Sequence, residues 1–528
     1  MNTAAPEAGL AEPHLAEILA AVGLDVEYVR AEGNTIHRLD EEGREIPVLD
    51  FVGGFGSLIL GHNHPEIVAR AQELLSAQLP IHAQFSRAPH ANRLAAALNT
   101  VLRRELGEDE QYFAIFANSG AEAVEAAVKH AELDRTLKVA ALTEEIDEHL
   151  AYARSQVRDG LAVPADTAHA RFGTGASGDP VRDAEELIAH VGRFNALRLS
   201  EAPLFLAPEG AFHGKLVGSV QLTHNEGFRV PFKALAAQAR FLPLDQPDAI
   251  RKTFEAERRV LLDLAVGDGR ITVVEREYPV FCAFVLEPIQ GEGGINVLTR
   301  EFAEAVREAC DAFDCPVIVD EIQSGMGRSG AFLASSLIGL RGDYYTLAKS
   351  LGGGVAKTSV ALIRASRYRK EFELVHSSTF AKDAFSSQIA LRTLELLEAD
   401  GGRLYRTVAE RGQALRTRID AVRADFPDVL KEVRGAGLML GVEFQDRSDS
   451  ATGNIQELAR SGFLGYAVAG YLLRAHSVRL FPTGSAVNTL RLEPSVQLTD
   501  EEIAQLETGL RDVCSVLRDG DEARFFGG

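Results

Sequence analysis

Short apolar runs alternate with amphipathic segments through the middle of the chain, from about residue 90 to residue 380. Runs at 112–116, 283–287, 317–320 and 344–348 have the length of strands, and the segments between them carry apolar residues at helical spacing. Helices that connect successive strands cross the face of the sheet, so that neighbouring strands run parallel. The alternation therefore predicts an α/β fold with a mostly parallel sheet covered by helices.

The 528 residues are too many for one simple core, so two or three domains are expected. We expect an N-terminal arm over 1–75 that forms part of a small domain, a large domain over 76–384, and a C-terminal small domain over 385–528. In the last segment a long helical pattern precedes strand-like runs at 438–444 and 489–492. This pattern is typical of a smaller α/β domain.

An insertion over 132–200 interrupts the predicted large domain. Its segments 143–157 and 183–197 have helical periodicity, and a glycine-rich stretch of small and polar residues lies between them. We interpret the insertion first as surface decoration or as an extension of a dimer. A lid near the mouth of an active site is a second hypothesis, and a docking site for a partner is a third.

The net charge of −21 argues against nucleic acid or an anionic membrane as the main partner. No apolar run is long enough to predict a membrane span, and the N-terminus lacks the basic start of a signal peptide. The four cysteines have no metal-ligand spacing. We therefore expect no metal site, and reduced, buried thiols in the cytoplasm.

An acidic residue and a lysine stand at the ends of two predicted strands. Asp320 closes the run 317–320, and Lys349 follows the run 344–348. Ligands of parallel sheets bind beyond such strand ends, where a desolvated lysine has a lowered pKa and a nucleophilic free amine. A carboxylate about 4 Å from a protonated ring nitrogen attracts it by roughly 4 kcal/mol at an effective dielectric near 20. The two residues suit pyridoxal phosphate (PLP), a cofactor that acts as an electron sink.

Two further segments suit the same cofactor. Ser119, Gly120 and Ala121 follow a predicted strand and open a helix, which directs free backbone N–H groups and the helix dipole toward an anion such as a phosphate. Phe212 follows another strand-like run. Its ring can lie on a flat cofactor ring, a contact worth roughly 1 kcal/mol beyond the burial of area.

Seven segments carry a resemblance to a known family; in chain order they are NSGAEAVEAAVK, GAFHGK, LEPIQGEGG, VIVDEIQSGMGRSG, TLAKSLGGG, HSSTF and LRLEP. Together they resemble the class III (omega-type) PLP-dependent aminotransferases, which include ornithine, GABA and acetylornithine aminotransferases. The resemblance covers nearly the whole chain except the insertion and the two ends. It implies the PLP-dependent transferase fold of fold type I and a homodimer with shared active sites.

The resemblance implies a role for each matching residue. Lys349 would bind PLP covalently and move a proton, Asp320 would pair with the ring nitrogen, and Gln323 would bind the ring oxygen. Arg491 would clamp the carboxylate of an amino-acid donor, and Glu292 would pair with Arg491 when a substrate lacks that carboxylate. The other implied cofactor-binding residues are Ser119, Gly120, Ala121, Phe212, His213, Glu287 and Thr379, the last reaching the phosphate of the neighbouring subunit.

The resemblance implies an aminotransferase that carries an amino group from a donor such as glutamate or alanine to an aldehyde or ketone in a ping-pong cycle. A PLP-dependent decarboxylase or aminomutase of the same family is the alternative. A non-catalytic protein of this fold is a third hypothesis, which the joint presence of Lys349, Asp320 and Gln323 disfavours. The helical insertion resembles that of aminotransferases of caerulomycin-type natural-product biosynthesis, which act on a bipyridine aldehyde.

Overall fold

A seven-stranded sheet forms the centre of the computed structural model, which describes residues 11–83, 86–449 and 453–527. The strand order is β4-β15-β14-β13-β10-β6-β7. Every neighbouring pair from β14 to β7 is parallel, whereas β15 is antiparallel to both of its neighbours. The predicted mostly parallel sheet is confirmed. Its strands are β4 (Tyr112–Ala117), β6 (Leu204–Pro208), β7 (Ala239–Leu242), β10 (Phe281–Leu286), β13 (Val317–Asp320), β14 (Tyr344–Leu347) and β15 (Ser359–Arg364).

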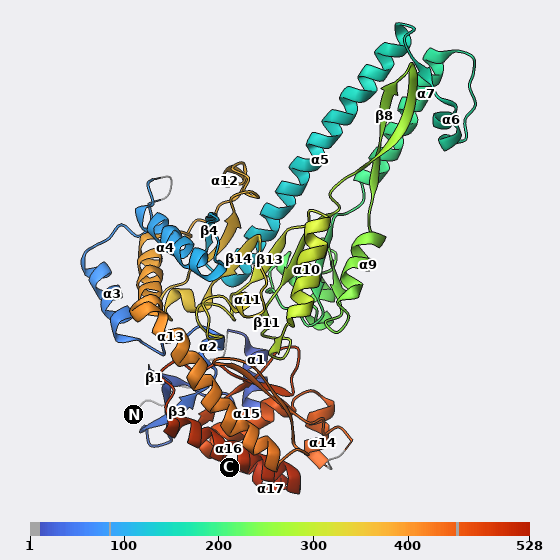
Figure 1. Ribbon diagram of the computed structural model, residues 1–528. Coiled ribbons are helices and arrows are strands. Elements are labelled where there is room, and N and C mark those ends of the chain that lie inside the picture. The colour runs from blue at the N-terminus through green and yellow to red at the C-terminus, as the bar shows by residue number, and fades with distance from the viewer. Residues whose placement is uncertain (1–10, 84–85, 450–452, 528) are drawn as a thin grey trace.

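Helices cover both faces of this sheet because its central strands are apolar along their whole length (Figure 1). Ile318 of β13 points to the face covered by the first turns of α5 (Gly120–Arg158), where it joins a buried cluster with Val124. Its neighbours in β13 point to the opposite face, where Phe302 of α10 (Arg300–Ala312) stacks edge-on against Phe284 of β10. The alternation of side chains along each strand thus produces two apolar layers.

The two ends of the chain meet in a second body, shown below the central sheet in Figure 1. One sheet has the order β1-β2-β3-β18, so that strands from the N-terminal segment pair with a strand near the C-terminus. A second, antiparallel sheet has the order β16-β17-β20-β19. These strands are β1 (Tyr28–Glu32), β2 (Thr35–Leu39), β3 (Glu45–Asp50), β16 (Leu430–Ala436), β17 (Met439–Phe444), β18 (Val478–Arg479), β19 (Phe481–Pro482) and β20 (Thr489–Leu492).

Long helices complete this second body and link it to the large sheet. The helix α13 (Ala384–Asp425) runs from one body to the other, and its backbone leaves helical geometry between Ala399 and Gly402 (Figure 1). The helices α15 (Leu464–His476) and α16 (Asp500–Asp519) pack on each other and on the strand β18. The strands predicted at 438–444 and 489–492 are confirmed as β17 and β20.

An arm projects from the central sheet and is formed mainly by two helices and a β-hairpin (Figure 1). Both helices predicted for the insertion are confirmed, since 143–157 lies within α5 and 183–197 lies within α7 (Pro180–Leu199). The hairpin of β8 (Val260–Gly267) and β9 (Arg270–Glu277) was not predicted. The arm also contains β5 (Val163–Pro164) and α6 (Asp166–Phe172).

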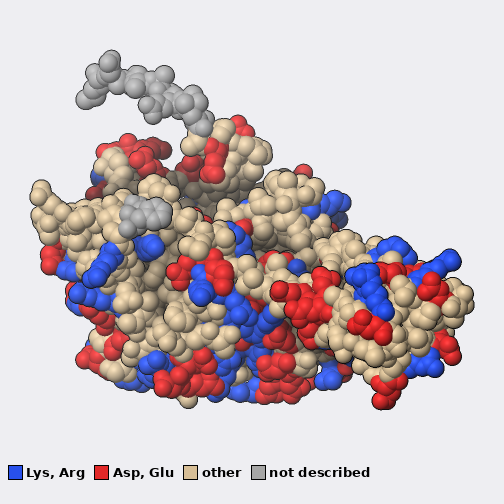
Figure 2. All heavy atoms as spheres, turned by 90° about the horizontal axis from the view of Figure 1, so that it is seen from above, with Lys and Arg blue, Asp and Glu red and all other residues tan. Residues whose placement is uncertain are grey.

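The hairpin has a recognisable turn signal. Asp268 and Gly269 connect the two strands and both have positive φ, which is the geometry that Asp-Gly favours in a two-residue turn. One buried cluster joins the hairpin to both helices, with Val157, Val191 and Leu262 among its members. Acidic and basic side chains are interspersed over the face shown in Figure 2, and on the arm Arg154 pairs with Glu185.

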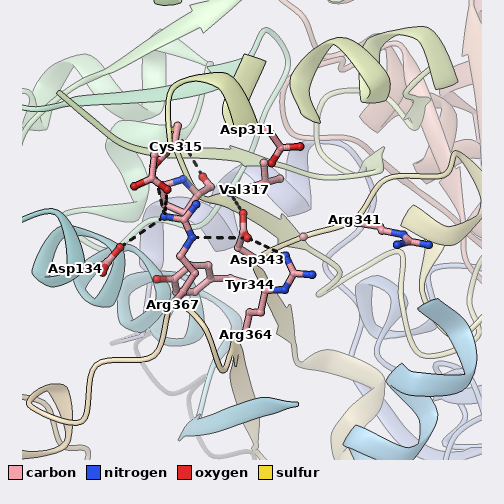
Figure 3. A network of polar contacts seen from close by, with 12 residues as sticks. Asp134, Asp311, Cys315, Val317, Arg341, Asp343, Tyr344, Arg364 and Arg367 are labelled. Carbon is pink, nitrogen blue, oxygen red and sulfur yellow. Dashed lines mark hydrogen bonds and ion pairs between the residues drawn. The ribbon is translucent and has the colours of Figure 1, made fainter. Parts of the chain in front are cut away.

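A buried charge cluster lies at the amino ends of β13 and β14, opposite the ends that carry Asp320 and Lys349 (Figure 3). Asp343 is 2% exposed, and its Oδ2 accepts hydrogen bonds from the Val317 N–H at 2.9 Å and from Arg307 at 3.0 Å. Arg364 and Arg367 approach its other oxygen at 3.6 and 3.8 Å. The carboxylate therefore interacts with three guanidinium groups and joins two adjacent strands.

Replacing Asp343 with alanine is expected to lower the free energy of unfolding by about 3–5 kcal/mol, because it removes the buried carboxylate that the Val317 N–H and the partly buried Arg307 both bind. Thermal unfolding of the purified protein measures the effect. Asp311 provides the matched control, since its side chain is 65% exposed and pairs with the same Arg307. Its alanine variant should lose less than about 1 kcal/mol. Equal destabilisation by the two variants would contradict this account of the cluster.

Candidate active site

Asp320 and Lys349 lie at the same edge of the central sheet. Asp320 is the last residue of β13, and Lys349 follows the parallel neighbour β14 by two residues. The carboxyl ends of parallel strands meet at one edge, which is the usual ligand position of such sheets. The structure therefore brings together the two residues on which the sequence prediction depends.

Three groups fix the buried carboxylate of Asp320. Its Oδ1 accepts hydrogen bonds from Thr346 Oγ1 and from the Ile322 N–H, both at 3.1 Å, and its Oδ2 lies 2.8 Å from His213 Nδ1. Burial lowers the pKa of His213, but the hydrogen bond and charge of Asp320 outweigh it, and the pKa is raised above its usual value. The pair is suited to hold positive charge at the bottom of the site.

The amine of Lys349 is held in a desolvated position. Burial lowers its pKa below the usual lysine value, opposed mainly by the charges of Glu493 and Glu292. The residue also has φ of 44°, a left-handed conformation that is uncommon outside glycine and that clusters at functional sites. Because only the free amine is a nucleophile or a base, the lowered pKa prepares Lys349 for both tasks.

Gln323 and Glu287 fix the loops next to Asp320. The Gln323 Nε2 donates to Glu493 Oε1 at 2.7 Å. Glu287 accepts from the backbone N–H groups of Phe212 and Gly291, both at 2.9 Å, and burial raises its pKa to about 7. A Cβ at Gly291 would lie 2.2 Å from Gln323 Oε1, so a larger residue there would displace the Gln323 amide.

The start of α5 is the predicted anion-binding end of the site. Ser119 caps the helix, and its Oγ accepts from the Glu122 N–H at 3.4 Å. The next two backbone N–H groups, those of Gly120 and Ala121, have no partner within the helix. A Cβ at Gly120 would lie 3.0 Å from Ile322, which places this helix start beside the loop that follows Asp320.

Arg491 and Glu292 form a partly buried ion pair at the second body. The Arg491 Nη2 lies 2.5 Å from Glu292 Oε2, which also accepts from the Gly484 N–H at 2.6 Å. Burial raises the pKa of Glu292, but the charge and hydrogen bond of Arg491, with smaller contributions from Lys349 and the Gly484 N–H, together outweigh it, so that the pKa is lowered. The Nε and Nη1 atoms of Arg491 have no hydrogen-bond partner among the described residues. The guanidinium therefore has donors left for a further acceptor.

Aromatic rings line the approach to this ion pair, and most of them were missed by the sequence prediction. Phe55 lies 4.9 Å from the Arg491 guanidinium and packs edge-on against Phe481. Phe228 packs edge-on against the predicted Phe212, and Lys215 Nζ lies 4.1 Å from the centre of the Phe228 ring. These rings come from distant segments and have no common spacing that could have identified them.

Thr379 lies in an exposed turn near the start of α5. The preceding Ser378 accepts a hydrogen bond from Asn118 at 2.9 Å, which ties this turn to the predicted phosphate end. The sequence prediction also missed Glu493, a fully buried carboxylate that directly follows β20. An acid at the end of a strand was the signal that identified Asp320, and the same signal was present at Glu493.

The cofactor implied by the resemblance fits these residues. Lys349 offers a buried amine, and Asp320 a fixed carboxylate for a protonated ring nitrogen. The start of α5 offers N–H groups for a phosphate. Arg491 Nη1 and Glu493 Oε2 are buried polar atoms without a hydrogen-bond partner among the described residues, as expected where a polar ligand binds.

Comparisons with known proteins find solved structures of similar fold. An amine transaminase from an uncultivated Pseudomonas species in its PLP-bound form is 21% identical, with a TM-score of 0.66 and coverage of 98% of each chain. The ornithine aminotransferase from Toxoplasma gondii ME49 is 22% identical, with a TM-score of 0.63 and coverage of 94% of this chain and 91% of that chain. The N-acetylornithine aminotransferase from Stenotrophomonas maltophilia K279a is also 22% identical, with a TM-score of 0.59 and coverage of 95% and 99%.

These structures have the same fold as the chain. The family model for class-III aminotransferases matches residues 20–514, which is nearly the whole sequence. The chain therefore belongs to the class-III aminotransferase family, whose members use PLP, and it is a transaminase.

Proposed function

We propose that this transaminase transfers an amino group from an α-amino acid of the glutamate or alanine type to an aldehyde or ketone in a ping-pong cycle. The observation that carries the proposal is the ion pair between buried Arg491 and Glu292. Arg491 keeps two nitrogens without a hydrogen-bond partner in the described structure, and these can bind a donor carboxylate. Glu292 neutralises the same guanidinium when the second substrate has no carboxylate.

The residues at the sheet edge have different roles in the reaction. Bound PLP supplies an electron sink that stabilises negative charge on the substrate carbon. Asp320, held by His213 and Thr346, keeps a positive charge at the ring nitrogen. Lys349 would be the base that takes the proton from the substrate α-carbon and delivers it to C4′ of the bound cofactor, for which its lowered pKa suits it. Arg491 orients the donor.

The rings around the ion pair support an aromatic acceptor, and a bipyridine-type aldehyde of natural-product biosynthesis is the acceptor class we propose. Phe55, Phe228 and Phe481 offer faces and edges against which a flat aromatic aldehyde can stack. Tyr466 packs edge-on against Phe481 and extends the same wall. An aromatic substrate would gain from these contacts without needing a carboxylate for Arg491.

We also propose a cytoplasmic homodimer in which the turn that contains Thr379 reaches the neighbouring active site. Three large apolar side chains around this turn are exposed in the single chain: Leu374, Val375 and Phe380 are 91%, 66% and 61% exposed. Such a group of exposed apolar side chains supports a surface that a second subunit covers. All four cysteines are buried free thiols, which suits a reducing compartment.

The shape of the arm supports the interpretation of the insertion as surface decoration or dimer extension. The far end of the arm, where α6 lies, is at the opposite end of the molecule from α15 and α16 (Figure 1). The active-site edge of the sheet faces this second body, because Arg491 of β20 approaches Glu292. A lid over the site of the same chain is therefore disfavoured.

Replacing Arg491 with glutamine is expected to lower kcat/KM for glutamate and alanine by about 10²-fold or more, because a charge-assisted clamp on the donor carboxylate is lost. Amine donors without a carboxylate should change far less. Steady-state kinetics with both donor types measure the contrast. The Glu292→Gln variant is the matched control, and its main loss should fall on the substrate that lacks a carboxylate. An equal loss for both donor types in Arg491→Gln would contradict the clamp.

A further inference from the structure

Glu493 is a buried carboxylate between the second body and the catalytic edge of the sheet. The residue is 0% exposed, and its backbone N–H donates to Phe51 O at 2.7 Å. Gly56 lies between Glu493 and the segment of Lys349: a Cβ on Gly56 would come within 2.9 Å of Glu493 Oε1, and Gly56 O accepts from Ser350 Oγ at 2.9 Å. The carboxylate is therefore held by packing in one place.

The two oxygens of Glu493 have different surroundings. Oε1 accepts the 2.7 Å hydrogen bond from Gln323 Nε2. Oε2 has no hydrogen-bond partner among the described residues and lies 4.0 Å from Arg491 Nη1. A carboxylate with an unpaired buried oxygen is costly unless nearby cations compensate it. The buried guanidinium of Arg328, which donates to the carbonyl of Leu438 at 3.2 Å, also interacts electrostatically with Glu493.

The negative charge of Glu493 acts most directly on the pKa of Lys349. Burial lowers the pKa of Lys349, and Glu493 is the strongest of the charges that oppose burial. Glu292 and Glu287 act in the same direction as Glu493, and Arg491 acts in the opposite direction. Two bodies of the protein thus contribute to the protonation of one amine.

The hydrogen bond to Glu493 fixes the orientation of the Gln323 side-chain amide. A carboxylate only accepts, so the amide nitrogen of Gln323 must face Glu493. Its carbonyl oxygen then faces Gly291, against which it is tightly packed. One N–H of the amide stays available for an acceptor in the site. If the amide were reversed, its oxygen would meet the carboxylate, and two acceptors would repel each other.

We propose that Glu493 is a positioning residue of this active site, which fixes the direction of the Gln323 amide through one oxygen and supplies negative charge to Lys349 and Arg491 through the other. The inference rests on the role proposed for Lys349. The end of β20 thus provides two groups of the active site: Arg491, which binds the donor carboxylate, and Glu493, whose negative charge favours the protonated form of the Lys349 amine.

Two conservative variants separate the two effects. Glu493→Gln keeps the size and an oxygen that can accept from Gln323, but it removes the charge. Glu493→Asp keeps the negative charge, but its shorter side chain moves the carboxylate away from Gln323. The matched control is Glu321→Gln, which removes another fully buried carboxylate whose hydrogen bonds come from Ser324, Ala334 and Ser335 instead.

The first measurement is the pH midpoint for acetylation of Lys349 in the apoenzyme, followed by peptide mass spectrometry. Removing a neighbouring negative charge disfavours the ammonium form, so Glu493→Gln should lower the midpoint by about one unit. Glu493→Asp and Glu321→Gln should remain close to the parent protein. An unchanged midpoint in Glu493→Gln, or an equal shift in Glu321→Gln, would overturn the electrostatic role. Wild-type transamination measured alongside tests the proposed function separately.

The second measurement is the dissociation constant of PLP, determined by fluorescence titration of the apoenzyme. Glu493→Asp should weaken PLP binding about tenfold, because the Gln323 amide loses the bond that orients it. Glu493→Gln should bind PLP nearly as well as the parent protein. PLP affinity that is unchanged in Glu493→Asp would overturn the orienting role, and this test remains decisive even when the glutamine variant does not fold.

Discussion

Replacing Lys349 with alanine is expected to abolish transamination, with a loss of at least about 10⁴-fold in kcat. The variant removes the buried amine that we assign as both the covalent attachment point of PLP and the base that moves the proton. Alanine offers neither function. Steady-state assays with an amino-acid donor and an aldehyde acceptor measure the loss.

Lys252 provides the matched control for this variant. It lies on the exposed side of α9 (Asp248–Ala256), away from the strand ends that carry the site. Its alanine variant should keep full activity. Reduction of the PLP-loaded enzyme with borohydride, followed by peptide mapping, should place the cofactor on Lys349 in the parent protein. A label on another lysine, or activity retained by Lys349→Ala, would contradict the assignment.

Replacing Asp320 with asparagine is expected to lower kcat/KM by about 10³-fold. The carboxylate contributes roughly 4 kcal/mol to holding a positive charge about 4 Å away at an effective dielectric near 20, and asparagine has no charge to contribute. The variant also removes the partner that raises the pKa of His213, so a second positive charge at the bottom of the site becomes less stable. Steady-state kinetics and the dissociation constant of PLP, measured on the same preparation, separate the loss in catalysis from the loss in cofactor binding.

The control for Asp320→Asn is Asp311→Asn, in which the changed side chain is 65% exposed and lies on α10. This variant should lose no activity beyond the error of the assay. Thermal unfolding should show that both variants are folded, because Asp320 is fixed mainly by neighbours that remain able to bond an asparagine. An Asp320→Asn variant within tenfold of the parent protein would show that its charge is not needed.

Much of the central sheet can be predicted from the sequence because its strands are short apolar runs that end in distinctive residues. Asp320 and Lys349 are recognisable for the same reason, since Asp320 ends one buried strand and Lys349 follows its parallel neighbour by two residues. The helices of the arm are also predictable from their periodicity. The hairpin of β8 and β9 was missed although Asp268-Gly269 is a strong turn signal, because it lies outside the segment recognised as an insertion.

The rest of the site depends on contacts that periodicity does not encode. Glu493 and Gln323 are far apart in the sequence, and only the packing of the second body on the large sheet brings their side chains to 2.7 Å. Phe55 meets Arg491 for the same reason. Such pairs arise where two separately predictable bodies touch, so each residue alone has the appearance of an ordinary core or surface position.

A half-reaction tests the central claim most directly. Enzyme loaded with PLP is mixed with glutamate or alanine and no acceptor, while the visible absorbance and the released oxo acid are followed together. A ping-pong transaminase should lose its visible band once and release about one equivalent of oxo acid per active site, then stop until an aldehyde is added. Release of carbon dioxide, or of oxo acid in large excess without an acceptor, would contradict the account.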